Sequence, residues 1–171
     1  MKKTPLIISI IIVTIVAILL FYKKPIGDTI AQQKYGPEIE KFTKLIAEKK
    51  CEAGDEVYIG LAQDYGYTKD FKKALATYDI MSQCYPDAYQ VLSDKHKLLL
   101  HNRASLYEDW GYHLKNTEND PRNAEKKYQE AAKIFKSIIQ TFGNTDKLNA
   151  DEIRGYENRI EQIQKYHLGG N

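Results

Sequence analysis

The sequence predicts an all-α protein, and three observations support this fold class. From residue 37 onward, apolar residues recur at helical spacing along each segment. Helix-start and helix-stop residues bound the segments, as Asp120-Pro121 and Gly143 do for one of them. No segment shows the apolar–polar alternation, bounded by turns, that is typical of a half-buried strand. The 171 residues suit one domain of ordinary size, which excludes a multidomain enzyme.

The charge balance argues against a protein that binds nucleic acid. The chain has 25 Lys and Arg residues against 23 Asp and Glu residues, a formal net charge of +2. Four of the lysines flank a single apolar block, and without them the balance is 21 basic against 23 acidic side chains, or −2. Proteins that bind the phosphate backbone carry a positive excess, so we expect no nucleic-acid partner.

Residues 6–22 form an uninterrupted apolar block, LIISIIIVTIVAILLFY, without a charged side chain. A helix of this length spans roughly 26 Å, close to the roughly 30 Å of hydrocarbon in a bilayer. Lysine pairs on both sides of the block suit the headgroup regions. We therefore predict a membrane anchor at residues 1–24, with a single transmembrane helix over residues 5–22.

A cleaved secretory signal is the alternative, because two lysines before an apolar stretch also open such signals. The block is longer than a usual signal core, and Phe-Tyr-Lys-Lys-Pro follows it in place of a small-x-small cleavage site. The flanking lysines are equal in number and do not decide the orientation. Since the whole folded part follows the span, we expect a single-pass protein of the bacterial inner (cytoplasmic) membrane with a periplasmic, extracytoplasmic C-terminal domain.

The chain after the anchor divides into a linker and one helical domain. Residues 25–36 carry Pro25, Gly27 and Gly36 without a sustained period, which predicts an irregular linker. The helical domain is expected over residues 37–168. Capping and breaking residues predict helices at about 37–50, 55–67, 70–84, 88–114, 121–142 and 149–167. An interruption of the 88–114 helix near Asp94 stays open, and a capping box of Asn149 and Glu152 opens the last helix.

A repeated pattern of bulky and small residues runs through the helices. Its first unit, about 55–88, has Tyr58, Leu61, Ala62 and Tyr65 on one helix and Ala74, Tyr78 and Met81 on the next, followed by Pro86. This spacing resembles the tetratricopeptide repeat, in which small residues let two antiparallel helices approach and large ones fill the space around them. The resemblance implies a stack of helical hairpins.

A second unit, about 97–142, matches the same pattern less completely. It has Leu100, Ala104, Tyr107 and Gly111 on its first helix and Ala124, Tyr128 and Ala131 on its second. It departs from the pattern in Arg103, in about eight extra residues between the helices and in the missing final proline. The segment before residue 50 and the helix after Asn149 then act as end pieces, the latter as a terminal capping helix. The alternative is a plain helical bundle.

The sequence contains no motif for catalysis, for a cofactor or for a metal ion. The four histidines are His96, His101, His113 and His167, and no two are spaced as metal ligands on one helix. No nucleotide-binding glycine loop, GxSxG or CxxC motif occurs. We therefore expect no enzyme, no cofactor and no metal site.

Cys51 and Cys84 are the only cysteines, and two interpretations of them stay open. In an up-down-up helix order, both lie at the same edge of the helix layer, so a disulfide can join them. Such a bridge indicates an oxidising compartment and supports the outward orientation. The alternative is two separate thiols buried in the core.

The resemblance also implies which residues contact a partner, because tetratricopeptide-like stacks bind peptides or partner helices along the first helix of each pair. At the matching positions stand Glu56, Ile59, Gln63, Tyr67, Leu98, His101, Ser105 and Glu108. This surface is polar and somewhat acidic. The lysine and asparagine clamp that chaperone-binding relatives use is not reproduced, since Ile59 and Gln63 occupy two of its places.

These features favour a membrane-anchored adaptor or assembly factor that binds a protein or a peptide. An envelope-located immunity or inhibitor protein is the alternative, which the size and the anchor permit, and an enzyme of unfamiliar type is the third hypothesis. Two repeats make a short groove, so the sequence also leaves open a homo-oligomer that pairs through an exposed apolar end.

Overall fold

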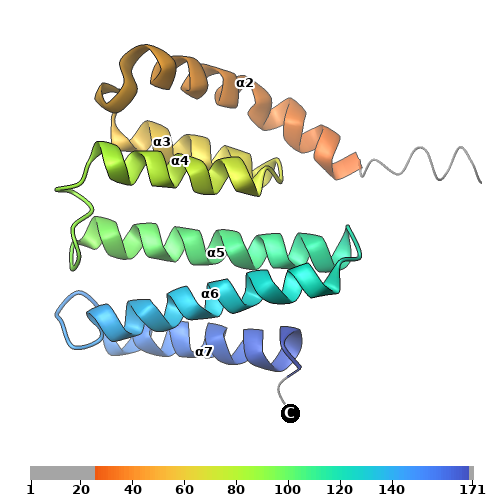
Figure 1. Ribbon diagram of the computed structural model, residues 1–171, viewed down its shortest axis with the longest axis vertical. Helices are drawn as coiled ribbons and strands as arrows, with labels where there is room; N and C mark the ends of the chain where they lie inside the picture. Colours follow the sequence, from red (N-terminus) through yellow and green to blue (C-terminus); the bar gives the residue numbers. More distant parts are fainter. Residues whose placement is uncertain (1–25, 170–171) are drawn as a thin grey trace, which may run out of the picture.

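The computed structural model describes residues 26–169, which form six α-helices and one 3₁₀-helix. No strand occurs in this part of the chain, so the predicted all-α fold is confirmed. The elements are α2 (Ile26–Lys49), η1 (Lys50–Ala53), α3 (Asp55–Tyr67), α4 (Phe71–Cys84), α5 (Asp94–Asn116), α6 (Pro121–Phe142) and α7 (Ala150–His167). Figure 1 shows the helices stacked in chain order, with α2 at one end and α7 at the other.

The predicted anchor at residues 1–24, with its span at 5–22, lies outside the described residues. Among residues 26–169, no helix combines the length and the apolar character that crossing a bilayer requires. Even α2, the first helix of the described residues, carries charged side chains such as Lys34 and Glu38.

α2 differs from its prediction at its N-terminal end. The sequence predicted an irregular linker at 25–36 and a helix that begins at Pro37, whereas α2 begins at Ile26 and contains Pro37 in its interior. A proline inside a helix removes one backbone hydrogen bond and often ends or kinks the helix. Residues 26–36 are helical nonetheless, so the prediction of an irregular segment there is wrong.

Packing against α3 explains why α2 continues through its proline. On one side of the proline, the ring of Tyr35 stacks on the ring of Tyr67, with ring centroids 4.7 Å apart. On the other side, the ring of Phe42 lies against Gly60 so closely that a Cβ atom on this glycine would come within 2.9 Å of the ring. Tertiary contacts therefore hold both halves of α2 on one neighbour and outweigh the local effect of the proline.

α3 and α4 form the first antiparallel hairpin, in which two small residues occupy the contact. Ala62 of α3 and Ala74 of α4 are both 0% exposed. Large side chains surround them, and we call this cluster the N-terminal core: Tyr58, Ala62, Phe71, Ala74, Tyr78, Met81, Tyr89, Leu99 and Leu106. The last two come from α5, so the first hairpin needs the third helix to complete its core.

α5 and α6 form the second, longer hairpin. The ring of Tyr128 on α6 lies directly over Gly111 on α5, where a Cβ atom would be 3.0 Å from the ring. The same ring also stacks on His167 of α7, with centroids 4.0 Å apart. The cluster around it, the C-terminal core, is made of Ala104, Leu114, Ala124, Tyr128, Ala131, Ala132, Phe135, Ile138, Phe142, Leu148, Tyr156, Ile160 and Ile163.

The two cores meet at one aromatic residue of α5. Trp110 packs against both cores and stacks on Phe71 of α4, with centroids 5.6 Å apart. The ammonium group of Lys127 lies 3.7 Å above its ring. An ion pair between Arg103 and Asp79 also joins α5 to α4. The contact between α4 and α5 is nevertheless much smaller than that within either hairpin, so the domain consists of two hairpins joined along one side.

α5 begins later than the sequence predicted. A helix was expected from about residue 88, with an interruption near Asp94 left open, whereas residues 85–93 form turns and α5 starts at Asp94. Ser93 ends the turns, because its hydroxyl accepts a hydrogen bond from the backbone N–H of His96 at 3.0 Å. A serine in this position satisfies one of the free N–H groups of the first helical turn and so sets the helix start.

α6 and α7 begin where their capping residues indicated. The side chain of Asp120 accepts a hydrogen bond from the backbone N–H of Asn123 at 3.2 Å. The capping box of α7 is complete, because Asn149 accepts from the N–H of Glu152 at 2.9 Å while the Glu152 carboxylate accepts from the N–H of Asn149 at 3.0 Å. Each cap satisfies backbone groups that the helix itself leaves unpaired.

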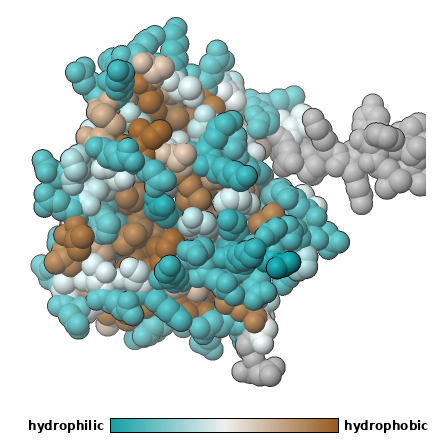
Figure 2. All heavy atoms as spheres, viewed as in Figure 1, coloured by the Kyte–Doolittle hydropathy of each residue, from teal (hydrophilic) through white to brown (hydrophobic). Residues whose placement is uncertain are grey.

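Apolar side chains also reach the surface of the domain. Figure 2 shows brown apolar groups between teal polar ones in the upper and middle parts of the stack on the face that it presents. The most exposed large apolar residues include Val91 at 70% and Leu98 at 50%. Exposed apolar groups that gather in one place mark binding surfaces more often than scattered ones do.

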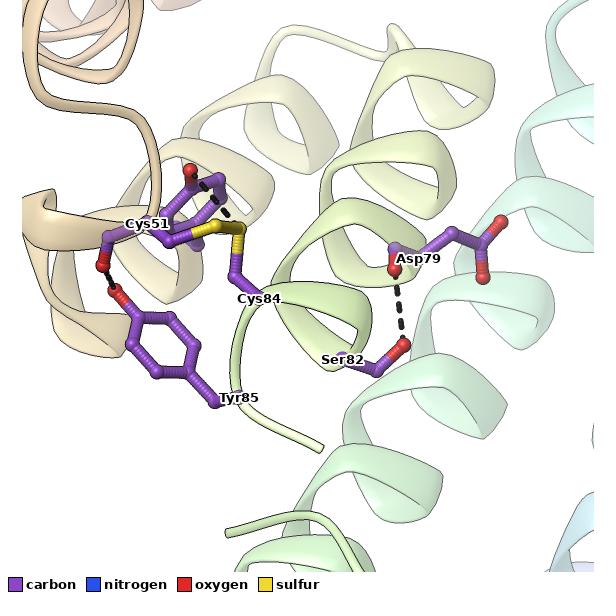
Figure 3. Close-up of a disulfide and its surroundings, with 6 residues drawn as sticks. Cys51, Asp79, Ser82, Cys84 and Tyr85 are labelled. Carbon is purple, nitrogen blue, oxygen red and sulfur yellow. Dashed lines mark hydrogen bonds between the residues drawn. A yellow bond between two sulfur atoms is a disulfide. The ribbon is translucent and has the colours of Figure 1, made fainter. Parts of the chain in front are cut away.

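Cys51 and Cys84 are joined by a disulfide, the bridged one of the two arrangements that the sequence left open. Their Cα atoms lie 5.1 Å apart, and the bond links η1 to the last residue of α4 (Figure 3). The hydroxyl of Tyr85 donates a hydrogen bond to the carbonyl of Cys51, as Figure 3 also shows. The bridge therefore holds the C-terminal end of α2 and η1 against the first hairpin.

Loss of the disulfide is expected to destabilise the protein by about 3 to 4 kcal/mol, because the bond restricts the unfolded chain across a separation of 33 residues. Urea unfolding of the full chain, followed by circular dichroism with and without reductant, measures this loss. The double variant C51S/C84S serves as the control, since reductant cannot affect it. An unfolding midpoint of the wild-type chain that reductant leaves unchanged would contradict the structure.

Gly111→Ala is expected to lower the free energy of unfolding by about 1 to 3 kcal/mol, because the new methyl group meets the buried ring of Tyr128, which is also stacked on His167. Gly155→Ala on α7 is the matched control, since nothing lies within 4 Å of its Cβ position. That variant should gain up to about 1 kcal/mol from helix propensity. Thermal unfolding measures the change in midpoint for both variants. Equal shifts of the same sign would refute the close contact between Gly111 and the ring of Tyr128.

Candidate interaction groove between α3 and α5

An apolar pocket of about 210 Å³ opens between α3 and α5. Its wall combines side chains from four parts of the chain, namely Ile59, Tyr78, Met81, Tyr89, Leu98 and Leu99. Polar groups stand among them, namely Asp55, Glu56, Lys95 and Asn102. A concave apolar surface with a few convergent polar groups is the usual form of a binding site.

A second pocket of about 200 Å³ continues the first along the same two helices. Tyr78 and Asn102 line both pockets, so the two are contiguous. The second pocket is more polar and is lined further by Gln63, Tyr67, Lys69, Ser105, Leu106 and Asp109, together with Ala62 and Gly66. We call the two pockets together the α3–α5 groove, which has an apolar end and a polar end.

Tyr78 lies in the floor between the two ends of the groove. It is 3% exposed, and its ring belongs to the N-terminal core. Burial raises the pKa of Tyr78 to about 12, an effect that the neighbouring Asn102 amide partly opposes. The hydroxyl therefore keeps its proton at neutral pH. A phenol in this state can donate a hydrogen bond to an acceptor in the groove.

Three polar side chains fix the wall of the apolar end. Lys95 of α5 pairs with the carboxylate of Asp55 on α3 at 2.5 Å, and the hydroxyl of Tyr89 donates to the same carboxylate at 3.2 Å. The hydrogen bond from Lys95 lowers the pKa of Asp55, although burial opposes this effect. The charge of Asp55 is thus compensated inside the wall, and the loop that carries Tyr89 is tied to α3.

Six of the eight predicted partner-binding residues line the groove. Glu56, Ile59 and Leu98 stand at the apolar end. At the polar end stand Gln63, Tyr67 and Ser105. Tyr67 is 53% exposed although Tyr35 of α2 stacks on its ring. The structure therefore brings together residues of α3 and α5 that lie about forty positions apart in the sequence.

His101 and Glu108, the other two predicted contacts, face α7 and not the groove. The Nδ1 atom of His101 lies 3.2 Å from the hydroxyl of Tyr156. The carboxylate of Glu108 pairs with the guanidinium of Arg159, which also donates to Ser105 at 3.3 Å. These side chains serve the attachment of the terminal helix, because α7 covers that side of α5.

Several groove residues were not predicted as partner contacts. Met81 was named as part of the repeat pattern of the first unit but not as a partner contact. Asn102 was not singled out in this role, and its position four residues after Leu98, on the same side of the helix, is the signal that could have found it. Tyr89 and Lys95 gave no signal, because they lie in and just after the 85–93 turns, whose path the sequence did not predict.

Larger hollows exist on the domain, but they are less suited to a specific ligand. One of about 670 Å³ lies between α4, α5 and α6 and is wider and more open to solvent. Its charged lining residues are Arg103, Glu130 and Lys133, of which the first is already paired with Asp79. Size alone does not identify a binding site, whereas an enclosed apolar pocket with few polar groups does so more reliably.

A buried carboxyl group on α3 lies outside the groove. Asp64 is 6% exposed, and burial raises its pKa, with a further contribution from the charge of Glu38 on α2. Its Oδ2 atom has no hydrogen-bond partner among the described residues. Within residues 26–169, no group of three or more His, Cys, Asp or Glu side chains is placed to hold a metal ion. The groove itself offers apolar burial, hydrogen bonds and ion pairs.

No family model matches the chain, and no curated protein or solved structure matches it either. The assignment of a function therefore depends on the geometry of the groove and on the sequence pattern.

The stability of the domain is expected to fall as the pH drops below about 6.5, because burial, and then the charge of Arg159, lower the pKa of His101 from 6.5. Below this pH, His101 is protonated more readily in the unfolded chain than in the folded chain, so the free energy of unfolding decreases as the pH falls. Thermal unfolding at pH 7.5 and pH 5.5 measures this loss.

His101→Gln should make the midpoint less dependent on pH. Tyr156→Phe removes the contact of His101 with the tyrosine hydroxyl but keeps the histidine, so it should keep the pH dependence. An identical pH dependence in His101→Gln and the wild-type chain would contradict the burial of this imidazole.

Proposed function

We propose that this protein is a membrane-anchored adaptor or assembly factor that binds a peptide or a segment of a partner protein in the α3–α5 groove. The observation that carries the proposal is the contiguous pair of pockets, one apolar and one polar, on the facing sides of two helices. An extended segment can place an apolar side chain at one end of such a groove. It can then hydrogen-bond to Gln63, Asn102 and Ser105 at the other end.

The resemblance to tetratricopeptide repeats supports this use of the groove. In such repeats, the first helix of each pair lines the binding surface, and α3 and α5 are the first helices of the two hairpins here. The small residues of the repeat pattern, such as Ala62, Ala74 and Ala104, are fully buried, as that pattern requires. Two hairpins make a short groove, which fits a short segment of a partner.

The chain also suggests where this binding takes place. The apolar block at residues 6–22 supports a single-pass anchor in the inner membrane. The disulfide between Cys51 and Cys84 supports an oxidising, extracytoplasmic location for the domain, because such bonds persist there and are rare in the cytosol. The groove would then face partners in the cell envelope.

Leu98→Glu is expected to abolish capture of the partner, because it puts a charge into the apolar end of the groove. The side chain is 50% exposed, so the fold should change in stability by less than about 1 kcal/mol. Val91→Glu is the matched control, since Val91 is 70% exposed and does not line the groove.

The measurement is chemical crosslinking in cells, followed by purification of the full chain and identification of the attached proteins. A partner that the wild-type chain and Val91→Glu capture, and that Leu98→Glu loses, supports the groove. Loss of the same partner in both variants, or in neither, would show that the contact lies elsewhere.

A further inference from the structure

The charges at the apolar end of the groove are not balanced. Asp55, Glu56 and Lys95 are the charged residues that line this pocket. Lys95 is engaged by Asp55 at 2.5 Å, whereas Glu56 makes no ion pair or hydrogen bond with any described residue. One carboxylate is thus free at the rim of an apolar pocket.

The positive end of the α3 dipole offsets part of this charge but does not remove the imbalance. Glu56 stands in the first turn of α3 next to Asp55. A helix N-terminus carries roughly half a positive charge, which falls off within the first turn. The two carboxylates share this half charge, and Lys95 compensates only one of them. A negative potential therefore remains beside the pocket opening.

The polar end of the groove has a different charge pattern. Lys69 and Asp109 are its charged lining residues and carry opposite charges. Between the two ends stand only neutral hydrogen-bonding side chains, among them Gln63 and Asn102. Any preference of the groove for a charged partner therefore comes from its apolar end, where Glu56 is the uncompensated charge.

We infer that the partner segment carries a large apolar side chain flanked by lysine or arginine. The apolar side chain fills the pocket of Ile59, Met81 and Leu98, and the flanking cation pairs with Glu56. A flanking acidic residue would instead meet two carboxylates, of which Lys95 compensates only one. This inference rests on the proposed function of the α3–α5 groove and adds the chemistry of its partner.

Three seven-residue peptides, acetylated and amidated at their ends, test the inference. They share the frame Gly-Ser-X-Leu-X-Ser-Gly, with X as Lys, Gln or Glu, and a fourth peptide replaces the Leu of the Lys form by Ala. The full chain is held in nanodiscs of phosphatidylcholine, whose zwitterionic headgroups do not concentrate basic peptides. Methyl NMR signals of Ile59, Met81 and Leu98 report on the apolar end of the groove.

The Lys peptide should bind about two- to five-fold more tightly than the Gln peptide, and the Glu peptide should bind most weakly, as expected for one partly exposed ion pair. The Ala form should lose most of its binding. Glu56→Lys should reverse the order of the Lys and Glu peptides. Glu161→Lys on α7, an exposed carboxylate outside the groove, should leave the order unchanged.

The outcomes separate the inference from the proposed function. If the three Leu peptides shift the methyl signals with equal affinity, or if Glu56→Lys leaves their order unchanged, the basic flank is refuted while groove binding stands. If the Ala form binds as well as the Lys peptide, the apolar anchor is refuted. If no peptide shifts any of the three methyl signals, peptide binding in the groove is refuted, and the inference is refuted with it.

Discussion

The close approach of the two helices within each hairpin is the constraint on which the rest of the structure depends. In the first hairpin, the fully buried Ala62 and Ala74 leave room for large aromatic side chains around the contact. In the second, Gly111 leaves room for the ring of Tyr128. Each close approach thereby lets large side chains pack into a core, and the core of the first hairpin is completed by Leu99 and Leu106 of α5. Because both cores draw on α5, this helix fixes the position of one hairpin relative to the other.

The groove follows from how the two hairpins are joined. They contact each other mainly through α4 and α5, at Trp110 and at the Arg103–Asp79 pair. α3 and α5 pack less extensively on each other, and the groove opens between them. The apolar end is further stiffened from outside. The disulfide holds the end of α4, and the loop that follows it carries Tyr89, whose hydroxyl binds Asp55 in the groove wall. A wall fixed in this way loses little conformational freedom when a partner binds.

Local sequence signals predicted most of the helices, because caps act within a few residues. The starts of α6 and α7 follow from Asp120 and Asn149, whose side chains bond to the neighbouring N–H groups. The start of α2 could not be predicted in this way. Pro37 is a local signal for a helix start, but the contacts that override it come from α3, a separate part of the chain.

The candidate site likewise combines features that the sequence pattern predicted with features that depend on long-range packing. The resemblance to tetratricopeptide repeats implied that residues of α3 and α5 share one surface, and the pockets include six of the eight predicted residues. Spacing could not show that α7 lies over His101 and Glu108, since that depends on how the terminal helix packs. It also could not place Tyr89, which reaches the groove from the 85–93 turns. Long-range packing, which no single segment encodes, accounts for both differences.

A photocrosslinking scan of the full chain in cells tests the central claim most directly. A photoreactive amino acid is placed at one exposed or half-buried position at a time along the groove sides of α3 and α5 and along the outer face of α7. The account predicts that adducts with one partner protein form at Glu56, Gln63 and Leu98 and are missing from α7. Adducts that appear on α7 and not at these groove positions would contradict it.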